Sequence, residues 1–154
     1  MTQAASAIAF DLPSGWQSVQ PESRMRLAQA TIPGVGGAGD LGVFFFGPGQ
    51  GGSPAANLAR WSGQMTGGAK PQQGSLTANG LQITWIDAAG TLQPSGMGMG
   101  PKTPQPNYRL FGAVVEGPGG PWFFKATGPE ATLGPQRDAF LKMLQSVHLK
   151  GQQA

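Results

Sequence analysis

The sequence has no cysteine, one histidine and few charged residues, which make up 11% of the chain. The lack of cysteine excludes disulfides, thiolate metal ligands and cysteine nucleophiles. His148 stands alone, and no paired-carboxylate spacing or G-x-S-x-G motif accompanies the dispersed aspartates, Asp11, Asp40, Asp87 and Asp138. We therefore expect no metal, no cofactor and no catalytic residues, and an enzyme is the less favoured class of protein.

Clustered positive charge is also missing. The ten Lys and Arg residues give a formal net charge of +3 and a pI of about 9.7, but they are scattered along the chain. Proteins that bind nucleic acid gather such residues into a patch or stripe. The sequence therefore predicts a mildly basic surface and no nucleic-acid partner.

Long apolar runs are absent as well. No run reaches 18 residues, so no membrane span is expected. Residues 1–9 lack the basic and apolar parts of a signal peptide. An N-terminus without these parts is also expected if a signal or lipid-anchor segment before Ala4 has been removed. On this basis the bacterial periplasm or cell envelope is favoured over the cytoplasm.

Glycine and proline, by contrast, are abundant, with 26 and 14 residues, while 39% of the chain is hydrophobic. This combination indicates a folded chain with many turns. We expect one monomeric domain over residues 1–154, with a flexible N-terminus. Residues 93–107 are predicted to form a mobile loop, because prolines cannot pair in a regular ladder.

Hydrophobic periodicity predicts mostly strands, with one helix in the middle of the chain and one at its end. The run 41–46 is apolar on both faces and suits a central strand. Ser53 suits an N-cap and Pro54 the first helical position, and Gly67 and Gly68 are expected to end this helix. Further strands are expected at residues 8–12, 25–32, 74–78, 81–87, 108–116 and 121–126, and a terminal helix at 132–146. Asn79-Gly80 is a strong hairpin signal. The predicted fold class is α+β, an antiparallel sheet with helices packed on it.

Some residues also carry a family resemblance. They are Phe10-x-Leu-Pro-x-Gly-Trp16, the strand-to-helix unit that ends in Asn57-x-x-Arg60-Trp61, the late hairpin and the terminal helix. With these features the chain resembles the PsbP-like family, and most closely an uncharacterised bacterial branch. The resemblance implies an α-β-α sandwich. It also implies a binding or assembly role, because the known members are a photosystem II extrinsic subunit and a nuclear import factor that shares the fold. No ligand motif of those members is present to carry over.

The loop between the central strand and the first helix is rich in glycine. Gly47, Gly49 and Gly52 satisfy G-x-G-x-x-G in the strand-to-helix context of a dinucleotide site. Against that function, Pro48 lies within the loop and no carboxylate closes a following strand about twenty residues on. As a P-loop the segment fails, because Ser53 stands where the phosphate-binding lysine is required. Glycines that make a tight turn are the simpler interpretation.

A small anion would nevertheless be sought first at the start of this helix. Free amides carry the positive end of the helix dipole there, and glycines let a ligand approach the backbone. Asn57, Arg60 and Gln64 form a polar stripe beside the packing stripe, and we expect it to be free to bind. The candidate ligand-binding residues are Gly49, Gln50, Gly51, Gly52, Ser53, Asn57 and Arg60.

Two clusters of apolar residues leave alternatives open. Trp122 and Phe123 cannot both point inward from a one-sided sheet, so either both faces are covered or one aromatic marks a contact surface. Met97 and Met99 carry thioethers of the kind that bind Cu(I), but without a histidine neighbour the set is incomplete. Whether this loop binds metal stays open.

Together these features favour a non-catalytic binding or assembly module of unknown ligand, an exported or lipoprotein-derived bacterial domain. Its partner would be another protein or a small ligand. The alternative is a small-anion or nucleotide-binding enzyme that uses residues 47–53 and the N-terminus of the following helix.

Overall fold

The computed structural model describes residues 8–20, 26–45, 53–68, 70–94, 103–117 and 121–149. In chain order the elements are β1 (Ile8–Ala9), β2 (Gln17–Val19), β3 (Arg26–Ile32), β4 (Gly39–Phe44), α1 (Pro54–Gly63), β5 (Met65–Thr66), β6 (Gln72–Ala78), β7 (Leu81–Leu92), β8 (Gln105–Glu116), β9 (Trp122–Pro129), α2 (Glu130–Leu133), the 3-10 helix η2 (Gly134–Gln136), α3 (Arg137–Gln145) and β10 (His148–Leu149).

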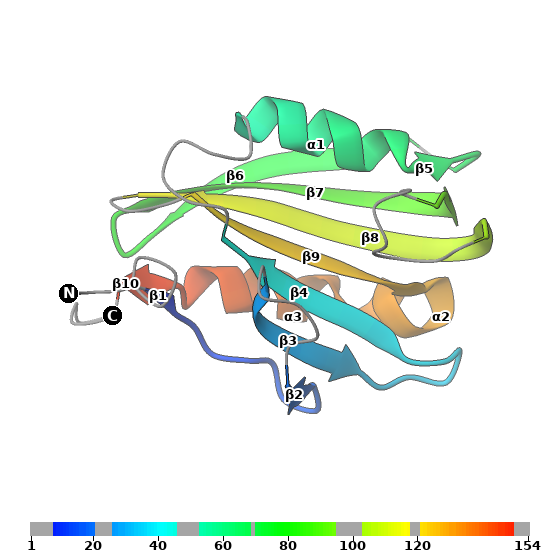
Figure 1. The fold of residues 1–154 in the computed structure, drawn as a ribbon, viewed down its shortest axis with the longest axis horizontal. Helices are drawn as coiled ribbons and strands as arrows, with labels where there is room; N and C mark the ends of the chain where they lie inside the picture. Colours follow the sequence, from blue (N-terminus) through cyan, green and yellow to red (C-terminus); the bar gives the residue numbers. More distant parts are fainter. Residues whose placement is uncertain are drawn as a thin grey trace.

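The fold is a three-layer α+β sandwich around an eight-stranded antiparallel sheet (Figure 1). The strand order is β2-β3-β4-β9-β8-β7-β5, and β6 also pairs with β7. α1 covers one face, while α2 and α3 lie on the other (Figure 1). The predicted fold class is therefore confirmed. In the described part of the chain, no helix is long and apolar enough to cross a membrane.

Both faces of the sheet are buried, which resolves the question raised by the aromatic run. On β9, Trp122 and Phe124 belong to the core on the α3 side, whereas Phe123 belongs to the cluster under α1. Trp122 is 0% exposed and Phe123 is 2% exposed. Side chains alternate across a strand, so adjacent aromatics can both be buried when helices cover both faces.

The central strand and the Asn79-Gly80 hairpin form as predicted. β4 lies between β3 and β9, and its burial is continuous from Leu41 to Phe44. Asn79 and Gly80, at φ values of 51° and 82°, make the turn between β6 and β7. Two consecutive positive φ values are the geometry of a type I′ turn, which matches the twist of a hairpin.

α1 starts as predicted but ends earlier. Ser53 is its N-cap and Pro54 its first residue, but the last helical residue is Gly63 rather than one beside Gly67. Met65 is instead drawn into β5, where it pairs with Leu92 of β7. Pairing at the sheet edge leaves Met65 8% exposed, so it is buried without a further helical turn.

The terminal helix is also different from the expectation, because it is broken. The expected helix over 132–146 is divided into α2, η2 and α3, with Pro135 in the 3-10 segment. Proline has no N–H to donate and its ring displaces the preceding turn, so a continuous helix across it is costly. The break turns the chain from the end of β9 onto the sheet.

The predicted loop over 93–107 is shorter than expected, because β8 already begins at Gln105. Pro106 is accommodated in this strand where β9 has ended. Residues 95–102 lie outside the described residues, and so do Met97 and Met99 and the N-terminal residues 1–7.

Candidate functional site

The start of α1, where the sequence places an anion site, is largely occupied by its own cap. The amide of Ala56 donates to Ser53 Oγ at 3.1 Å. Asn57 Nδ2 donates to the Ser53 carbonyl oxygen at 2.9 Å, and Asn57 is 1% exposed. Pro54 has no amide hydrogen. Among the described residues this leaves Ala55 as the first-turn amide open to a ligand.

The remaining polar residues of this helix are bonded too. Arg60 Nη2 donates to Asn57 Oδ1 at 2.6 Å, and its guanidinium lies 6.0 Å from the centre of the Trp61 ring. Lys125 Nζ donates to Gln64 Oε1 at 2.7 Å. The expectation of a free polar stripe is thus wrong: Asn57 points inward, and Arg60 and Gln64 already have partners. The other four candidates, Gly49, Gln50, Gly51 and Gly52, lie outside the described residues.

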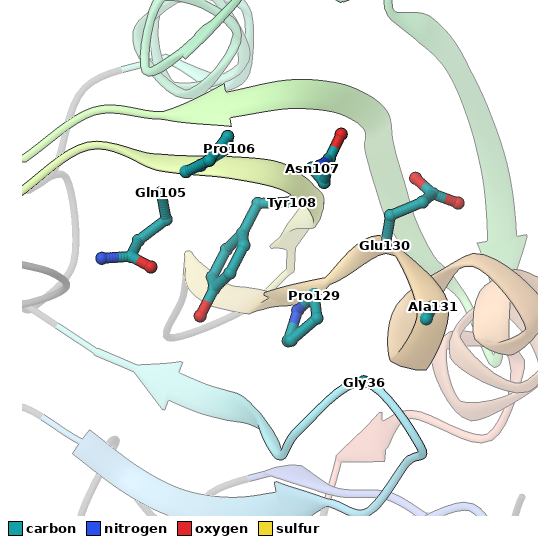
Figure 2. A pocket seen from close by; sticks show the side chains of 8 residues that line it. All are labelled: Gly36, Gln105, Pro106, Asn107, Tyr108, Pro129, Glu130 and Ala131. Atoms are coloured by element: carbon teal, nitrogen blue, oxygen red, sulfur yellow. The ribbon is translucent and has the colours of Figure 1, made fainter.

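A groove lies elsewhere, at the end of β8 (Figure 2). Its volume is about 610 Å³, and it is open to solvent. Tyr108 extends across it above Pro129 and Gly36, while Gln105 flanks the ring (Figure 2). The lining residues are Gly36, Gln105, Pro106, Asn107, Tyr108, Pro129, Glu130 and Ala131.

The groove exists because β8 is longer than its neighbour. Pairing between β8 and β9 ends at Tyr108 opposite Pro129, where the chain turns into α2. β8 continues along β7 as far as Gln105, which pairs with Leu92 across a register shift. Within that stretch Asn107 has a φ of 57°. Bulges and positive-φ residues redirect strands and are frequent at binding sites.

A group of charged residues lies beside the groove, under α2. Arg109 forms a two-point ion pair with Asp87, with Nε–Oδ1 at 2.6 Å and Nη2–Oδ2 at 2.7 Å. Its Nη1 also contacts Glu130 Oε2 at 2.9 Å. Asp87 is 5% exposed, so its charge is compensated almost entirely by protein groups. We call Asp87, Arg109, Glu130 and Arg137 the charged cluster.

Hydrogen bonding to Asp87, together with the charges of Asp87 and Glu130, holds the pKa of Arg109 above its ordinary range, against partial burial, which lowers it. A raised pKa on a base stabilises the fold at every pH below the unfolded-state pKa. That contribution is lost only as the pH rises through the folded-state value. Arg109 therefore stays charged throughout the physiological range.

Arg137 connects the charged cluster to α3 and to β6. Its Nη1 is 3.6 Å from Asp87 Oδ2 and donates to Gln72 Oε1. Its guanidinium also lies 5.1 Å from the centre of the Trp85 ring. The cluster thus fastens both segments of the broken helix to the sheet. Among the described residues, no three His, Cys, Asp or Glu side chains group as a metal site.

Sequence reasoning missed both the groove and the charged cluster. Asp87 and Arg109 are 22 residues apart, and only the register of β7 against β8 brings them together. The sequence held only a weak indication of the charged cluster. Asp87 and Arg109 are charged residues within strands that otherwise alternate between apolar and polar side chains. The groove had no signal, because three separate segments build it.

Comparison with known proteins yields a fold and no activity. No family model and no curated protein matches the chain. Among the solved structures that are similar is a Pseudomonas aeruginosa protein of unknown function described as a candidate regulator. The TM-score is 0.50 at 17% identity, over 76% of this chain and 78% of the other. This likeness concerns the fold alone.

Proposed function

We propose that this protein is a non-catalytic binding or assembly domain of PsbP-like architecture, and that the groove beside Tyr108 receives an extended segment of a partner protein. The observation that carries the proposal is the extension of β8 past the end of β9. The resemblance of Phe10-x-Leu-Pro-x-Gly-Trp16 to the PsbP-like family supports the role, and an exported or envelope location agrees with it.

The backbone of β8 favours an extended chain as the ligand. From Gln105 to Asn107 the strand has β7 on one side and, within the described structure, no strand on the other. Unpaired main-chain groups at such a position can pair with an incoming strand. Pro106 contributes no N–H, so main-chain bonds would be few and side chains would provide most of the contact.

The side chains of the groove suit a neutral segment better than a charged one. Tyr108 is half-buried, and Pro106 and Pro129 add apolar surface beside its ring. The amides of Gln105 and Asn107 can donate and accept hydrogen bonds. Glu130, the acidic residue of the lining, is already paired with Arg109. A few polar groups on an apolar surface are typical of binding sites.

Site-specific photocrosslinking in the native source tests this function. A benzophenone amino acid at Gln105 should capture one defined partner, and the same group at Gln145, exposed on α3, should not. Excess wild-type protein should compete for the crosslink, and excess Tyr108→Ala protein should not. Equal capture from both positions would contradict binding of the partner at the groove. Turnover in a hydrolase or NAD(P)-dependent screen, abolished by one polar substitution, would contradict a non-catalytic role.

The alternative, a small-anion or nucleotide-binding enzyme, has its own test. An NMR titration with phosphate, sulfate and a dinucleotide should leave Ser53 and Asn57 unshifted, because the cap already occupies the helix start. Saturable shifts there that weaken in Arg60→Ala would instead support the alternative.

A further inference from the structure

We propose that β6 is a self-association edge: it pairs antiparallel with β6 of a second copy, so that the two sheets join into one. This proposal does not depend on the groove, which lies on other strands. It differs from the sequence-based expectation of a monomeric domain.

β6 is a regular strand with an open side. Its seven residues pair with β7 without interruption, from Gln72 opposite Asp87 to Ala78 opposite Leu81. In the described structure β7 is its one strand neighbour. A two-residue turn makes Ala78 and Leu81 a hydrogen-bonded pair, and the bonding direction then alternates along the strand. The N–H and C=O groups of Thr77, Ser75 and Gln73 therefore point away from the sheet.

This edge lacks the features that prevent strands from pairing. Natural edges are protected by charged side chains, prolines, bulges or short length. β6 contains no proline, and residues 71–86, which cover β6, the turn and the first part of β7, contain no charged residue. The opposite edge is different, since β2 has only three residues, Gln17–Val19. Of the two edges, β6 is the one suited to a partner strand.

The sequence of β6 complements itself about Ser75. In an antiparallel pair centred there, Ser75 faces its own copy and Gln73 faces Thr77. The outward groups of these residues then form about six main-chain hydrogen bonds. Gln73, Ser75 and Thr77 are all exposed on one face, where hydroxyl and amide side chains can bond across the strands.

The opposite face of the strand fits the same register. Leu76 is half-buried on the α3 side, and the pairing places it beside Gly74 of the copy. Gly74 is under the Trp85 ring, where a Cβ would come within 2.5 Å of a ring carbon. The ring of Trp85 thus occupies the place of a side chain at Gly74, and the partner's leucine would lie beside this ring. A charge-free, self-complementary row indicates a second copy, because an isologous interface brings the same surface together twice.

Concentration-dependent sedimentation of the full chain tests the interface. Ser75→Lys places like charges at the symmetry axis, and Ser18→Lys is the matched control on exposed β2. We expect a wild-type dimer whose Kd rises about tenfold or more in Ser75→Lys and stays within about twofold in Ser18→Lys. A monomer at millimolar concentration, or a dimer weakened by Ser18→Lys alone, would overturn the proposal.

A crosslink gives a second measurement that does not require a destabilised edge. Because the chain has no cysteine, Ser75→Cys and Ser18→Cys each carry a single thiol. Directly opposed residues of paired strands lie within disulfide reach. Ser75→Cys should oxidise to a covalent dimer much faster than Ser18→Cys, and equal rates would contradict the pairing. Photocapture from Gln105 should persist in Ser75→Lys, so that failure of the interface and failure of the groove are distinguishable.

Discussion

The two faces of the sheet are built on different principles. Under α1, the buried cluster is made of apolar side chains, among them Leu58, Trp61 and Phe123. On the other face, a larger apolar core lies beside the charged cluster, which ties α2 and α3 to β7 and β8. α1 is therefore held by apolar packing, whereas α2 and α3 are held by apolar packing and by ion pairs.

The difference follows from the length and continuity of the helices. α1 is a single ten-residue helix, so one continuous stripe can fill the surface beneath it. α2 has four residues and α3 has nine, separated by Pro135, so neither offers a long stripe. Ion pairs have strict geometry, and here they fix the position of these short pieces on the sheet.

The largest effect should come from removing the carboxylate at the centre of the charged cluster. Asp87→Ala leaves Arg109 and Arg137 facing each other with one acidic partner fewer. Breaking a buried pair costs about 3–5 kcal/mol, so urea unfolding should show a loss of that size. Asp138→Ala, at an exposed position on α3, should stay within about 0.5 kcal/mol. Similar losses for both variants would mean that charge does not hold this face.

A smaller effect is expected from keeping the charge but changing its shape. Arg109→Lys cannot form the two-point contact with Asp87, and loss of a charged hydrogen bond costs about 1.5–3 kcal/mol. A paired lysine stabilises fully below its unfolded pKa of about 10.4 and loses that contribution above it. The variant should therefore lose additional stability from about pH 10 upward, where wild type does not. Parallel pH profiles would contradict the assigned role of Arg109.

On the α1 face the corresponding test is steric. A Cβ at Gly112 would lie 2.4 Å from a carbon of the Trp61 ring. Gly112→Ala should therefore cost about 1–3 kcal/mol through overpacking. At Gly63 a Cβ would meet nothing, so Gly63→Ala should be neutral or stabilise by up to about 1 kcal/mol. If the two alanine variants unfold alike, α1 is not held by close fit to β8.

The smallest effect concerns the cap of α1. Ser53→Ala removes the acceptor for the Ala56 amide and should cost about 1 kcal/mol. Amide exchange should accelerate in the first turn of α1 and remain unchanged in α3. Ser62→Ala, later in the same helix, is the control and should not accelerate it. Exchange that rises equally in both helices would indicate global rather than local loosening.

Features that are determined by residues adjacent in the sequence were predictable. Asn79-Gly80 specifies a turn, Ser53-Pro54 specifies a helix start, and the apolar run in β4 indicates a strand covered on both faces. Each depends on backbone preferences or local periodicity. These local signals do not depend on which residues lie across the sheet.

Features that depend on tertiary neighbours were not predictable. Met65 continues the apolar stripe of α1, yet it is captured by Leu92 of β7. Asn57 looks like a surface residue on a helical wheel, yet it is buried and bonds to Ser53. The groove needs the relative lengths of β8 and β9, which come from their register. One sequence does not state which strands are neighbours.

β1 and β10 form a separate two-stranded sheet, which brings the two ends of the described chain together. Ile8 pairs with Leu149 and Ala9 with His148, so the first and last described strands lie side by side. The Asp11 amide, bonded to Ser146 Oγ at 2.8 Å, reinforces this junction. The described chain is therefore almost a closed ring. Joining its ends by a short linker and opening it at the exposed turn over 35–38 should give a circular permutant with the same three layers.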